Sequence, residues 1–323
     1  MRNIAAILTI LLLLFTACQG TKDDVAESTG NINEISIIVS DALWNGKVGD
    51  SLRKKFAAPV DGLSQEEPIF TLNQYNDQTF AGNLKKRRNI IVVEKTGNPE
   101  FLFQQNSYCS PQNIFFLKGK TADSLLVLIQ MHSDEIIKRI KKTEISEYQS
   151  RNRINGLLDK KHYEKQYGIT IDVPKTYTRA IQKNSFTWLK RDMPGGNTNI
   201  MLYTVSYNQV ERDKDILNNI IAMRDSIGAL YIHGQDENTF MVTEDSYAPY
   251  LFMTSFKDKR AFETRGNWDM ENGTMGGPFI NYAVKDDKNH RYVVIEGFIY
   301  SPSSPRRDLI MEIEAIIKSV IFI

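Results

Sequence analysis

Short apolar segments separated by brief polar turns dominate the chain beyond residue 165, and this pattern constrains the fold more than any other feature. Such segments, and runs that alternate apolar with polar side chains, are typical of β-strands. One helical pattern, at 213–227, interrupts them, and short connections favour antiparallel neighbours. The pattern predicts an α+β fold with antiparallel sheets and packed helices. The predicted strands are 169–173, 186–190, 200–207, 240–242, 251–256, 261–270, 279–284 and 292–300.

The first half combines strands and amphipathic helices in a similar way. Thr121 is a suitable N-cap for a helix, and Ser133 resembles the cap of a second one. At the end of the chain, residues 308–320 repeat apolar side chains with the period of a helix. Because a strand, a turn and a helix follow one another in both halves, we expect two similar subdomains of α/β sandwich type. The predicted strands of the first half are 35–39, 69–75, 90–93 and 114–117.

The length of 323 residues suits one large domain or two ordinary ones. Gly168 is placed to end a long helical stretch, and new strand patterns begin directly after it. We therefore expect an N-terminal subdomain at 34–160, with a long helical connection, and a C-terminal subdomain at 161–323. Residues 1–17 and 18–33 precede them as a signal peptide and a flexible tether.

The first 18 residues, MRNIAAILTILLLLFTAC, carry a targeting signal. Arg2 precedes an apolar run, 4–15, that is shorter than the roughly 20 residues of a membrane-spanning helix but suits a secretory signal peptide. Phe15-Thr16-Ala17-Cys18 resembles the lipobox of bacterial lipoproteins, in which the cysteine is diacylated and becomes the new N-terminus. We therefore predict lipidation of Cys18, which would anchor the protein to a membrane. A plain signal peptide followed by an unrelated cysteine is the alternative.

The residues after Cys18 bear on location. Lys22-Asp23-Asp24 resembles the export signal that sends some Bacteroidota lipoproteins to the outer face of the outer membrane. We expect a lipid-anchored protein of the outer membrane, exposed on the cell surface. The periplasmic face is the alternative.

The balance of charge argues against a nucleic-acid partner. Lys and Arg total 40, and Asp and Glu total 39. Removing residues 1–17 takes away Arg2 alone, which leaves 39 of each sign. Proteins that bind nucleic acid usually show a strongly basic face. We expect a small molecule or another envelope protein as the partner.

Motifs for catalysis and metal binding are absent from the sequence. The four histidines, at 132, 162, 233 and 290, are widely spaced, and none neighbours a cysteine, so a His/Cys zinc site is not expected. With Cys18 lipidated, Cys109 remains, and no intramolecular disulfide can form. The chain has no nucleotide-binding glycine motif and no G-x-S-x-G nucleophile motif. We expect no cofactor and no metal, and we assign no catalytic residue.

The segment RGNWDMENGTMGGPF, residues 265–279, is the strongest candidate for a site. It connects two predicted strands and holds four glycines, of which Gly273 suits the tip of a turn. Glycines that let the backbone pass close to a bulky group suggest either a loop packed on its own tryptophan or a loop that faces a ligand or partner. The candidate ligand or partner residues are Arg265, Trp268, Asp269, Met275, Gly276, Gly277 and Pro278.

Several local patterns together resemble an uncharacterised domain family of Bacteroidota lipoproteins. They are Ile171-Asp-Val-Pro-x-x-Tyr177, Phe186-x-Trp188-x-x-Arg191, Arg265-Gly-x-Trp268, Met275-Gly-Gly-Pro-Phe279 and the segment Leu309 to Phe322. The resemblance extends over essentially the whole mature chain and is strongest from about residue 165. It implies no established activity. The Val-Pro-x-x-Tyr opening and the terminal helix also resemble PsbP/Mog1-type domains, which are α/β sandwiches with binding and scaffolding roles.

Two functions remain open on this sequence. A lipid-anchored envelope protein that binds a partner or ligand without catalysis agrees with the anchor and with the lack of catalytic motifs. The alternative is an envelope hydrolase with a site around Arg265, Trp268, Asp269 and Glu271, which requires its acidic groups to converge in a cleft. A deep pocket with a perturbed acid at this loop favours the hydrolase. A loop filled by Trp268 favours binding or a purely structural role.

Overall fold

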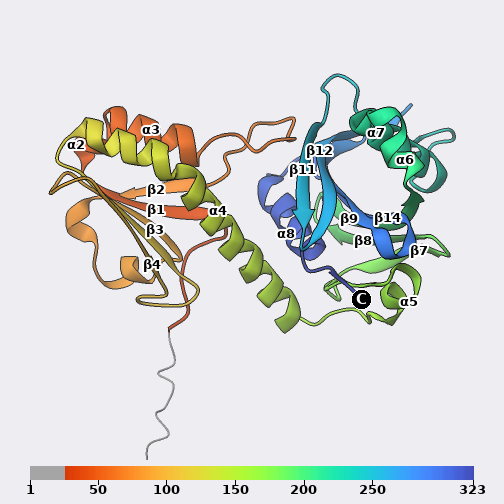
Figure 1. Ribbon diagram of the computed structural model, residues 1–323, viewed down its shortest axis with the longest axis horizontal. Coiled ribbons are helices and arrows are strands. Elements are labelled where there is room, and N and C mark those ends of the chain that lie inside the picture. Colours follow the sequence, from red (N-terminus) through yellow and green to blue (C-terminus); the bar gives the residue numbers. More distant parts are fainter. Residues whose placement is uncertain (1–25) are drawn as a thin grey trace, which may run out of the picture.

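The computed structural model describes residues 26–323, in which two groups of strands lie side by side and a long helix, α4 (Ala122–Ile154), runs from one to the other (Figure 1). The α+β class expected from the sequence is confirmed. The predicted signal peptide, Cys18 and Lys22-Asp23-Asp24 lie outside the described residues. Among the helices of residues 26–323, none is both long enough and apolar enough to cross a membrane.

The N-terminal sheet has five strands in the order β2-β1-β3-β5-β4. The pairs β1–β2, β1–β3 and β3–β5 are parallel, and the pair β4–β5 is antiparallel. This half therefore differs from the antiparallel arrangement that we expected. The strands are β1 (Glu34–Val39), β2 (Thr71–Tyr75), β3 (Asn89–Glu94), β4 (Glu100–Gln105) and β5 (Asn113–Lys118).

The segments between the strands explain the parallel pairing. The helices α2 (Asp41–Trp44) and α3 (Lys47–Phe56) lie between β1 and β2, and residues 76–88 connect β2 to β3. Parallel neighbours need such crossovers, whereas a tight hairpin joins antiparallel neighbours. The gap between the predicted strands 35–39 and 69–75 leaves room for a crossover, but the sequence does not show in which direction the next strand runs. The strands β1 and β3 are buried along almost their whole length, as is usual for parallel strands.

The helix α4 is a single element of 33 residues. Thr121 and Ser124 form a capping box at its N-terminus, which confirms the predicted start. The expected second helix start at Ser133 is wrong, because Ser133 is buried in the middle of α4. The apolar stripe continues at helical spacing through that position, and this burial outweighs the tendency of serine to cap.

The C-terminal sheet is antiparallel in every pair, which confirms the meander expected for this half. Its order is β10-β12-β13-β14-β9-β8-β7, and β11 lies beside β12. Figure 1 shows that the sheet is strongly curled. The two halves thus differ in strand order and direction. The strands are β7 (Thr178–Lys183), β8 (Phe186–Met193), β9 (Gly196–Ser206), β10 (Phe240–Thr243), β11 (Tyr250–Phe256), β12 (Lys259–Glu271), β13 (Gly276–Asp286) and β14 (Arg291–Tyr300).

Each face of this sheet has its own apolar core. The helix α8 (Arg307–Ile317) packs on one face, together with α5 (Lys161–Tyr167). The helix α7 (Ile216–Tyr231) packs on the other face. Side chains alternate between the two faces along each strand, so that Ile280 belongs to the α8 core and Phe279 to the α7 core.

The two short strands β6 (Ile169–Thr170) and β15 (Ile321–Phe322) pair with each other and bring the end of the chain beside the start of the C-terminal half.

The segment 26–33 is ordered on the N-terminal half, so the predicted tether does not extend to residue 33. The backbone N–H of Thr29 donates to the carbonyl of Lys86 at 2.7 Å. Ile32 and Asn33 are buried, and the Asn33 amide donates to Asp308 at 2.8 Å. The polar composition of the segment suggested a flexible tether, but its backbone groups find partners on neighbouring segments.

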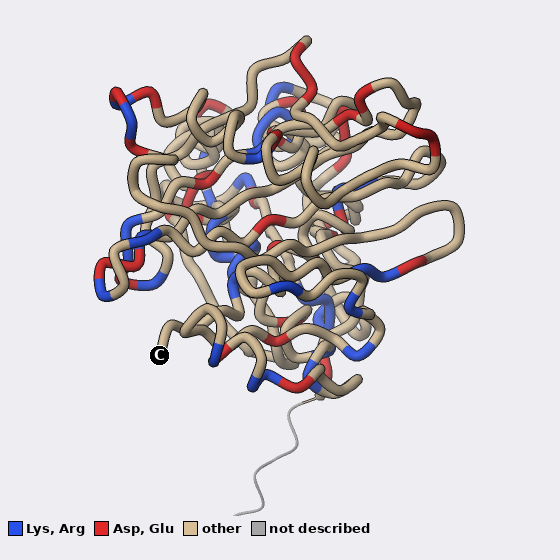
Figure 2. The backbone as a smooth tube through the Cα atoms, turned by 90° about the vertical axis from the view of Figure 1, so that its right-hand side faces the viewer, with Lys and Arg blue, Asp and Glu red and all other residues tan. Residues whose placement is uncertain are grey.

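Charges of both signs are interspersed over the face shown in Figure 2, as expected for a neutral chain. Within the described residues, two ion pairs are buried on both sides, Arg88 with Glu144 in the N-terminal half and Arg224 of α7 with Glu296 of β14. The second pair holds α7 to the C-terminal sheet. The guanidinium donates to the two carboxylate oxygens at 2.9 and 2.6 Å. The Asn281 amide donates to the same carboxylate at 2.7 Å, and the ring centroid of Phe279 lies 3.4 Å from the guanidinium carbon. The contacts join α7 to the centre of the sheet.

Replacing Arg224 with methionine should strongly destabilise the protein. The substitution leaves the Glu296 carboxylate buried without its counter-charge, and breaking a buried pair in this way costs about 3–5 kcal/mol. Urea denaturation of the full chain in detergent measures the loss. The matched control is Arg212→Met, which removes an exposed pair with Asp213 and should cost about 1 kcal/mol or less. Equal losses for both variants would contradict the structural role of the buried pair.

Candidate functional site

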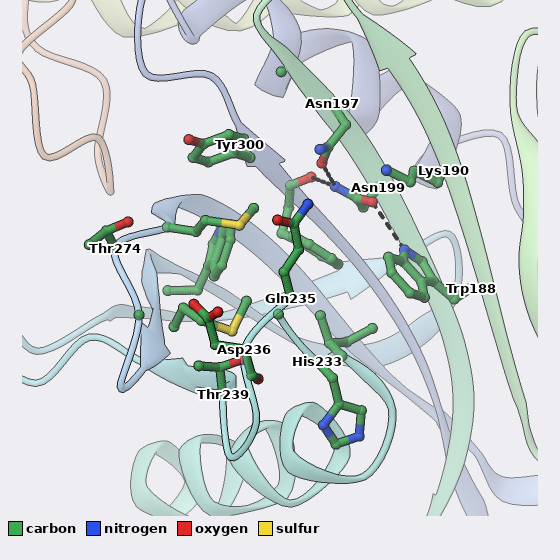
Figure 3. Close-up of a pocket in the computed structure, with 18 residues that line it drawn as sticks. Trp188, Lys190, Asn197, Asn199, His233, Gln235, Asp236, Thr239, Thr274 and Tyr300 are labelled. Carbon is green, nitrogen blue, oxygen red and sulfur yellow. Dashed lines mark hydrogen bonds between the residues drawn. The ribbon is translucent and has the colours of Figure 1, made fainter.

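A pocket of about 630 Å³ lies at one end of the curled C-terminal sheet (Figure 3). Its volume falls within the range of small-molecule sites, about 300–1,000 Å³. Five segments that are distant in sequence form its walls. They are β8, the start of β9, residues 232–239 after α7, the end of β12 with the turn that follows it, and the end of β14.

Aromatic side chains form much of the lining. Trp268 is 1 % exposed, and its indole N–H donates to the carbonyl of Ile299 at 3.0 Å. Phe298 meets the Trp268 ring edge-on, with the ring centroids 5.4 Å apart. Trp188 and Tyr300 are half-buried, so part of each ring remains accessible. The buried rings of Trp268 and Phe298 and the accessible rings of Trp188 and Tyr300 together make a rigid, partly apolar surface.

Asn199 fixes the orientation of Trp188. Its side-chain oxygen accepts the Trp188 indole N–H at 3.0 Å, and its amide nitrogen donates to Asn197 at 2.6 Å (Figure 3). The same nitrogen contacts the carbonyl of Phe298 at 3.4 Å. Because Asn199 is fully buried, these partners satisfy a polar group that would otherwise destabilise the fold. The ring of Trp188 is therefore held in place before any ligand binds.

Neutral polar groups around the pocket remain available for a ligand. Among the described residues, the side-chain nitrogen of Asn197, the amide of Gln235 and the hydroxyls of Thr274 and Tyr300 make no hydrogen bonds with the protein. Figure 3 shows Gln235 near the centre, with Tyr300 and Asn197 on one side of it and His233 on the opposite side. Convergent amide and hydroxyl groups beside aromatic rings suit a polar, uncharged ligand.

Two glycines allow β13 to pass close to its neighbours. A Cβ atom on Gly277 would lie 2.1 Å from the carbonyl oxygen of Ile299, and one on Gly276 would lie 2.5 Å from the Asp269 carboxylate. The expectation that these glycines permit a close approach agrees with these distances, although the nearest groups are the Ile299 carbonyl and the Asp269 carboxylate and not the ring of Trp268. Both glycines and the buried Pro278 lie behind the pocket wall, and none of the three lines it.

The sequence candidates 265–271 do not form one site. The register between β12 and β13 is regular from Ala261 to Asp269, so side chains alternate strictly between the two faces. Trp268 points into the pocket, whereas Arg265 lies on the α8 face, where it binds Glu263 at 2.6 Å and Glu314 at 2.9 Å.

Asp269 and Glu271 also lie outside the pocket. Both side chains are exposed. Burial, and then the nearby carboxylates Glu244 and Asp245, raise the pKa of the Asp269 carboxyl above its ordinary value. A perturbed acid is therefore present at the loop, but it does not face the pocket.

Trp268, Met275 and the turn residues Gly273 and Thr274 do line the pocket, so the segment contributes one wall of it. Sequence reasoning missed most of the other walls. Trp188 was part of a family pattern, and that pattern was the available signal. The polar residues Asn197, Asn199 and Gln235 carry no local signal, because their convergence depends on strand pairing over long range.

Comparison with protein families assigns the chain to a family. The sequence profile described as a domain of unknown function (DUF4837) matches residues 157–319, which is more than half of the chain, and the protein belongs to that family. A second domain of unknown function (DUF8532) matches residues 28–153. The search of curated proteins finds no match.

Solved structures show a weak similarity to Mog1 proteins. A mutant of the protein Mog1 matches with a TM-score of 0.32 at 8 % identity, over 48 % of this chain and 90 % of that chain. The Ran-binding protein Mog1p of Saccharomyces cerevisiae matches with a TM-score of 0.27 at 8 % identity and the same coverage.

The close approach at Gly277 predicts a strong effect of a single methyl group. In Gly277→Ala the new Cβ would overlap the Ile299 carbonyl, so that β13 must shift away from β14, which should cost about 1–3 kcal/mol. Thermal unfolding of the full chain and tryptophan fluorescence measure the effect on stability and on the pocket. Thr274→Ala in the adjacent exposed turn is the control and should change stability by no more than about 0.5 kcal/mol. A neutral Gly277→Ala substitution would show that the strands are not this close.

Proposed function

We propose that this protein is a lipid-anchored protein of the cell envelope that binds a neutral, polar ligand of carbohydrate type in the pocket beside Trp188 and Tyr300. The observation that carries the proposal is the combination, in one cavity of about 630 Å³, of accessible aromatic rings with uncommitted amide and hydroxyl groups.

The chemistry of a sugar ring matches this lining. One face of a pyranose is formed by C–H groups and packs on an aromatic ring, while its hydroxyl groups need hydrogen-bond partners of both kinds. Trp188 and Tyr300 offer the rings, and Asn197 and Gln235 offer amides that can donate and accept. Since a buried hydroxyl without a partner costs about 1–3 kcal/mol, the amides also favour a hydroxyl-rich ligand over an apolar one.

The charges near the pocket favour a neutral ligand over an ionic one. Lys190 pairs with Asp192 at 2.8 Å, so its charge is compensated. Asp236 is the one carboxylate among the lining residues, and its side chain is exposed. Neither sign of charge therefore dominates the cavity.

Binding has more support than hydrolysis. Glycoside hydrolases typically place two carboxyl groups about 5–9.5 Å apart on either side of the scissile bond. Asp269 and Glu271 lie outside the pocket, and Arg265 is engaged by two carboxylates on the opposite face of the sheet. The residues of the hydrolase alternative thus do not converge on a shared reacting centre.

The envelope location rests on the sequence. We place the protein at the outer membrane through a lipid on Cys18, and Lys22-Asp23-Asp24 favours the outer face over the periplasmic face. Two or three acyl chains give a stable anchor, because each buried methylene contributes about 0.8 kcal/mol.

Removing the accessible indole should weaken carbohydrate binding. We expect Trp188→Ala to lower the affinity for a bound sugar about three- to tenfold, because a stacked aromatic contact contributes about 0.5–1.5 kcal/mol. Isothermal titration of the full chain in detergent with neutral trisaccharides of glucose, mannose and N-acetylglucosamine measures this affinity.

The control variant for this titration is Trp44→Ala, which removes a partly exposed tryptophan of the N-terminal half and should leave the affinity unchanged. A panel in which no neutral oligosaccharide binds, or in which both variants lose affinity equally, would contradict carbohydrate recognition in this pocket.

The anchor is tested separately with Cys18→Ala in the intact precursor. Without the thiol no diacylglyceryl group can be attached, so we expect the variant to move from the detergent-rich to the aqueous phase in detergent phase partitioning. The mass of the mature wild-type protein should exceed that of its polypeptide by the mass of the acyl chains. The lipoprotein assignment would be wrong if the variant were still processed after residue 17 and remained in the membrane fraction.

A further inference from the structure

The strand β11 has a free edge. One side of it pairs with β12 along its whole length, from Tyr250 with Arg265 to Phe256 with Lys259. Within residues 26–323 no strand pairs with its other side. An unpaired edge presents a row of backbone N–H and C=O groups that can accept a further strand.

The side chains of this edge strand do not protect it. Edge strands are usually blunted by charges, by proline or by a covering segment, but the sequence of β11, YLFMTSF, contains neither a charge nor a proline. Met253 is 85 % exposed and Tyr250 is 51 % exposed. The rings of Tyr250 and Phe252 lie parallel, with their centroids 6.4 Å apart. Apolar side chains gathered on an open edge mark an interaction surface.

The cleft in front of this edge lies between the two halves of the protein. A cavity of about 340 Å³ is lined by Phe252, Met253 and Thr254 on one side and by Pro59, Val60 and Lys141 on the other. Lys141 also lines an adjoining cavity of about 600 Å³ along α4.

A third cavity connects the two ends of this region. It shares Thr254 and Glu263 with the cavity at the β11 edge, and it shares Lys318 with the cavity along α4. Neighbouring cavities thus share lining side chains, and we refer to the three together as the cleft, which is lined by α4, β11 and the end of α8.

The α4 side of the cleft is positively charged. Lys138, Lys141, Lys142 and Lys318 line this cavity, with Asp134 as the one acidic residue. In the part of the chain that the structure describes, the first three lysines form no ion pair, and Lys318 pairs with Glu314 of α8. Because the chain as a whole is neutral, this cluster is a local excess of positive charge.

The carboxylates beneath the lysines are already engaged. Arg265 binds both Glu263 and Glu314. Burial alone would raise the pKa of Glu314, but Arg265 and Lys318 outweigh it and hold the pKa well below the ordinary value. Burial also lowers the pKa of Lys141; Glu314 and Asp61 oppose this effect, and Arg265 and Lys318 add to it. Asp61 lines the β11 side of the cleft and lies near Lys141. A new anion beside α4 would therefore meet Lys138 and Lys142, which form no ion pair within the described residues.

We propose that the cleft between α4 and β11 binds an extended acidic segment of a partner protein, which adds a strand to the free edge of β11. Main-chain hydrogen bonds to β11 would provide most of the affinity, as in other cases of strand addition. Alternate side chains of the segment would lie on opposite faces of the extended sheet. Its apolar side chains would pack beside Met253, and its acidic side chains, on the face of Phe252, would face Lys138 and Lys142. This interaction is separate from ligand binding at Trp188.

Fluorescence polarisation of labelled peptides with the full chain in detergent tests the proposal. The probe is the seven-residue peptide Val-Glu-Val-Glu-Val-Glu-Val. One matched peptide carries lysine in place of glutamate, and another keeps the glutamates but has proline at its centre, which prevents strand pairing. We expect binding of the first peptide and at least tenfold weaker binding of the other two.

Variants of exposed residues identify the site without disturbing the fold. Lys138→Glu with Lys142→Glu, and separately Met253→Lys, should each lower the affinity for the acidic peptide about tenfold or more, since all three side chains are exposed. Lys54→Glu, an exposed charge reversal on α3, is the control and should have no effect. Trp188→Ala should also retain peptide binding, which separates this result from the test of the ligand pocket.

Four outcomes would overturn the proposal. Equal binding of the proline-containing peptide would mean charge attraction without strand addition, and equal binding of the lysine peptide would rule out an acidic partner. A dimer in light scattering that Met253→Lys dissociates, without peptide binding, would assign the edge to a second copy of the chain. Binding of anionic phospholipid vesicles that the double lysine variant loses, again without peptide binding, would assign the lysines to a lipid surface.

Discussion

The alternation of side chains along β12 is the constraint on which the C-terminal half depends. Each residue of this strand must serve either the core under α8 or the core under α7, because neighbouring side chains point to opposite faces. Trp268 therefore lines the pocket, whereas Arg265 lies on the other face and forms ion pairs with Glu263 and Glu314. Two distinct surfaces result, separated by one layer of backbone. A regular register across β13 keeps this division intact over nine paired residues, from Ala261 to Asp269.

Local sequence patterns predicted the elements better than their arrangement. The antiparallel meander, the capped start of α4 and the closing helix follow from periodicity and capping, which are local properties. The parallel pairing of the N-terminal sheet could not be predicted from such local properties. The direction of a strand depends on the point at which the preceding crossover returns to the sheet. The second helix start predicted at Ser133 was wrong for a related reason, because the burial of Ser133 within α4 comes from tertiary packing. Residues 26–33 read as a tether because their partners, such as Lys86, lie far along the chain.

The sequence predicted the location of the candidate site but not most of the residues that line it. The glycine-rich segment located one wall of the pocket, and Trp268 and Met275 lie there. Grouping Arg265 with Trp268 overlooked that a separation of three residues places side chains on opposite faces of a strand. The amides of Asn197 and Gln235 could not be found from sequence, since they meet only when β9 and the segment after α7 come together. The pocket forms only when five distant segments come together in the folded sheet, so no single segment predicts it.

The helix α4 gives the molecule a mechanical property that neither half has alone. Its 33 residues form a rod of roughly 50 Å, at about 1.5 Å per residue. Its first turns belong to the N-terminal core, and near its other end Tyr148 and Gln149 donate to backbone carbonyls of α8 at 3.1 and 2.9 Å. A force applied to the N-terminal half, the one nearer the predicted anchor, is thereby transmitted along a rigid lever to α8 and the curled sheet. The two halves are thus mechanically coupled through α4.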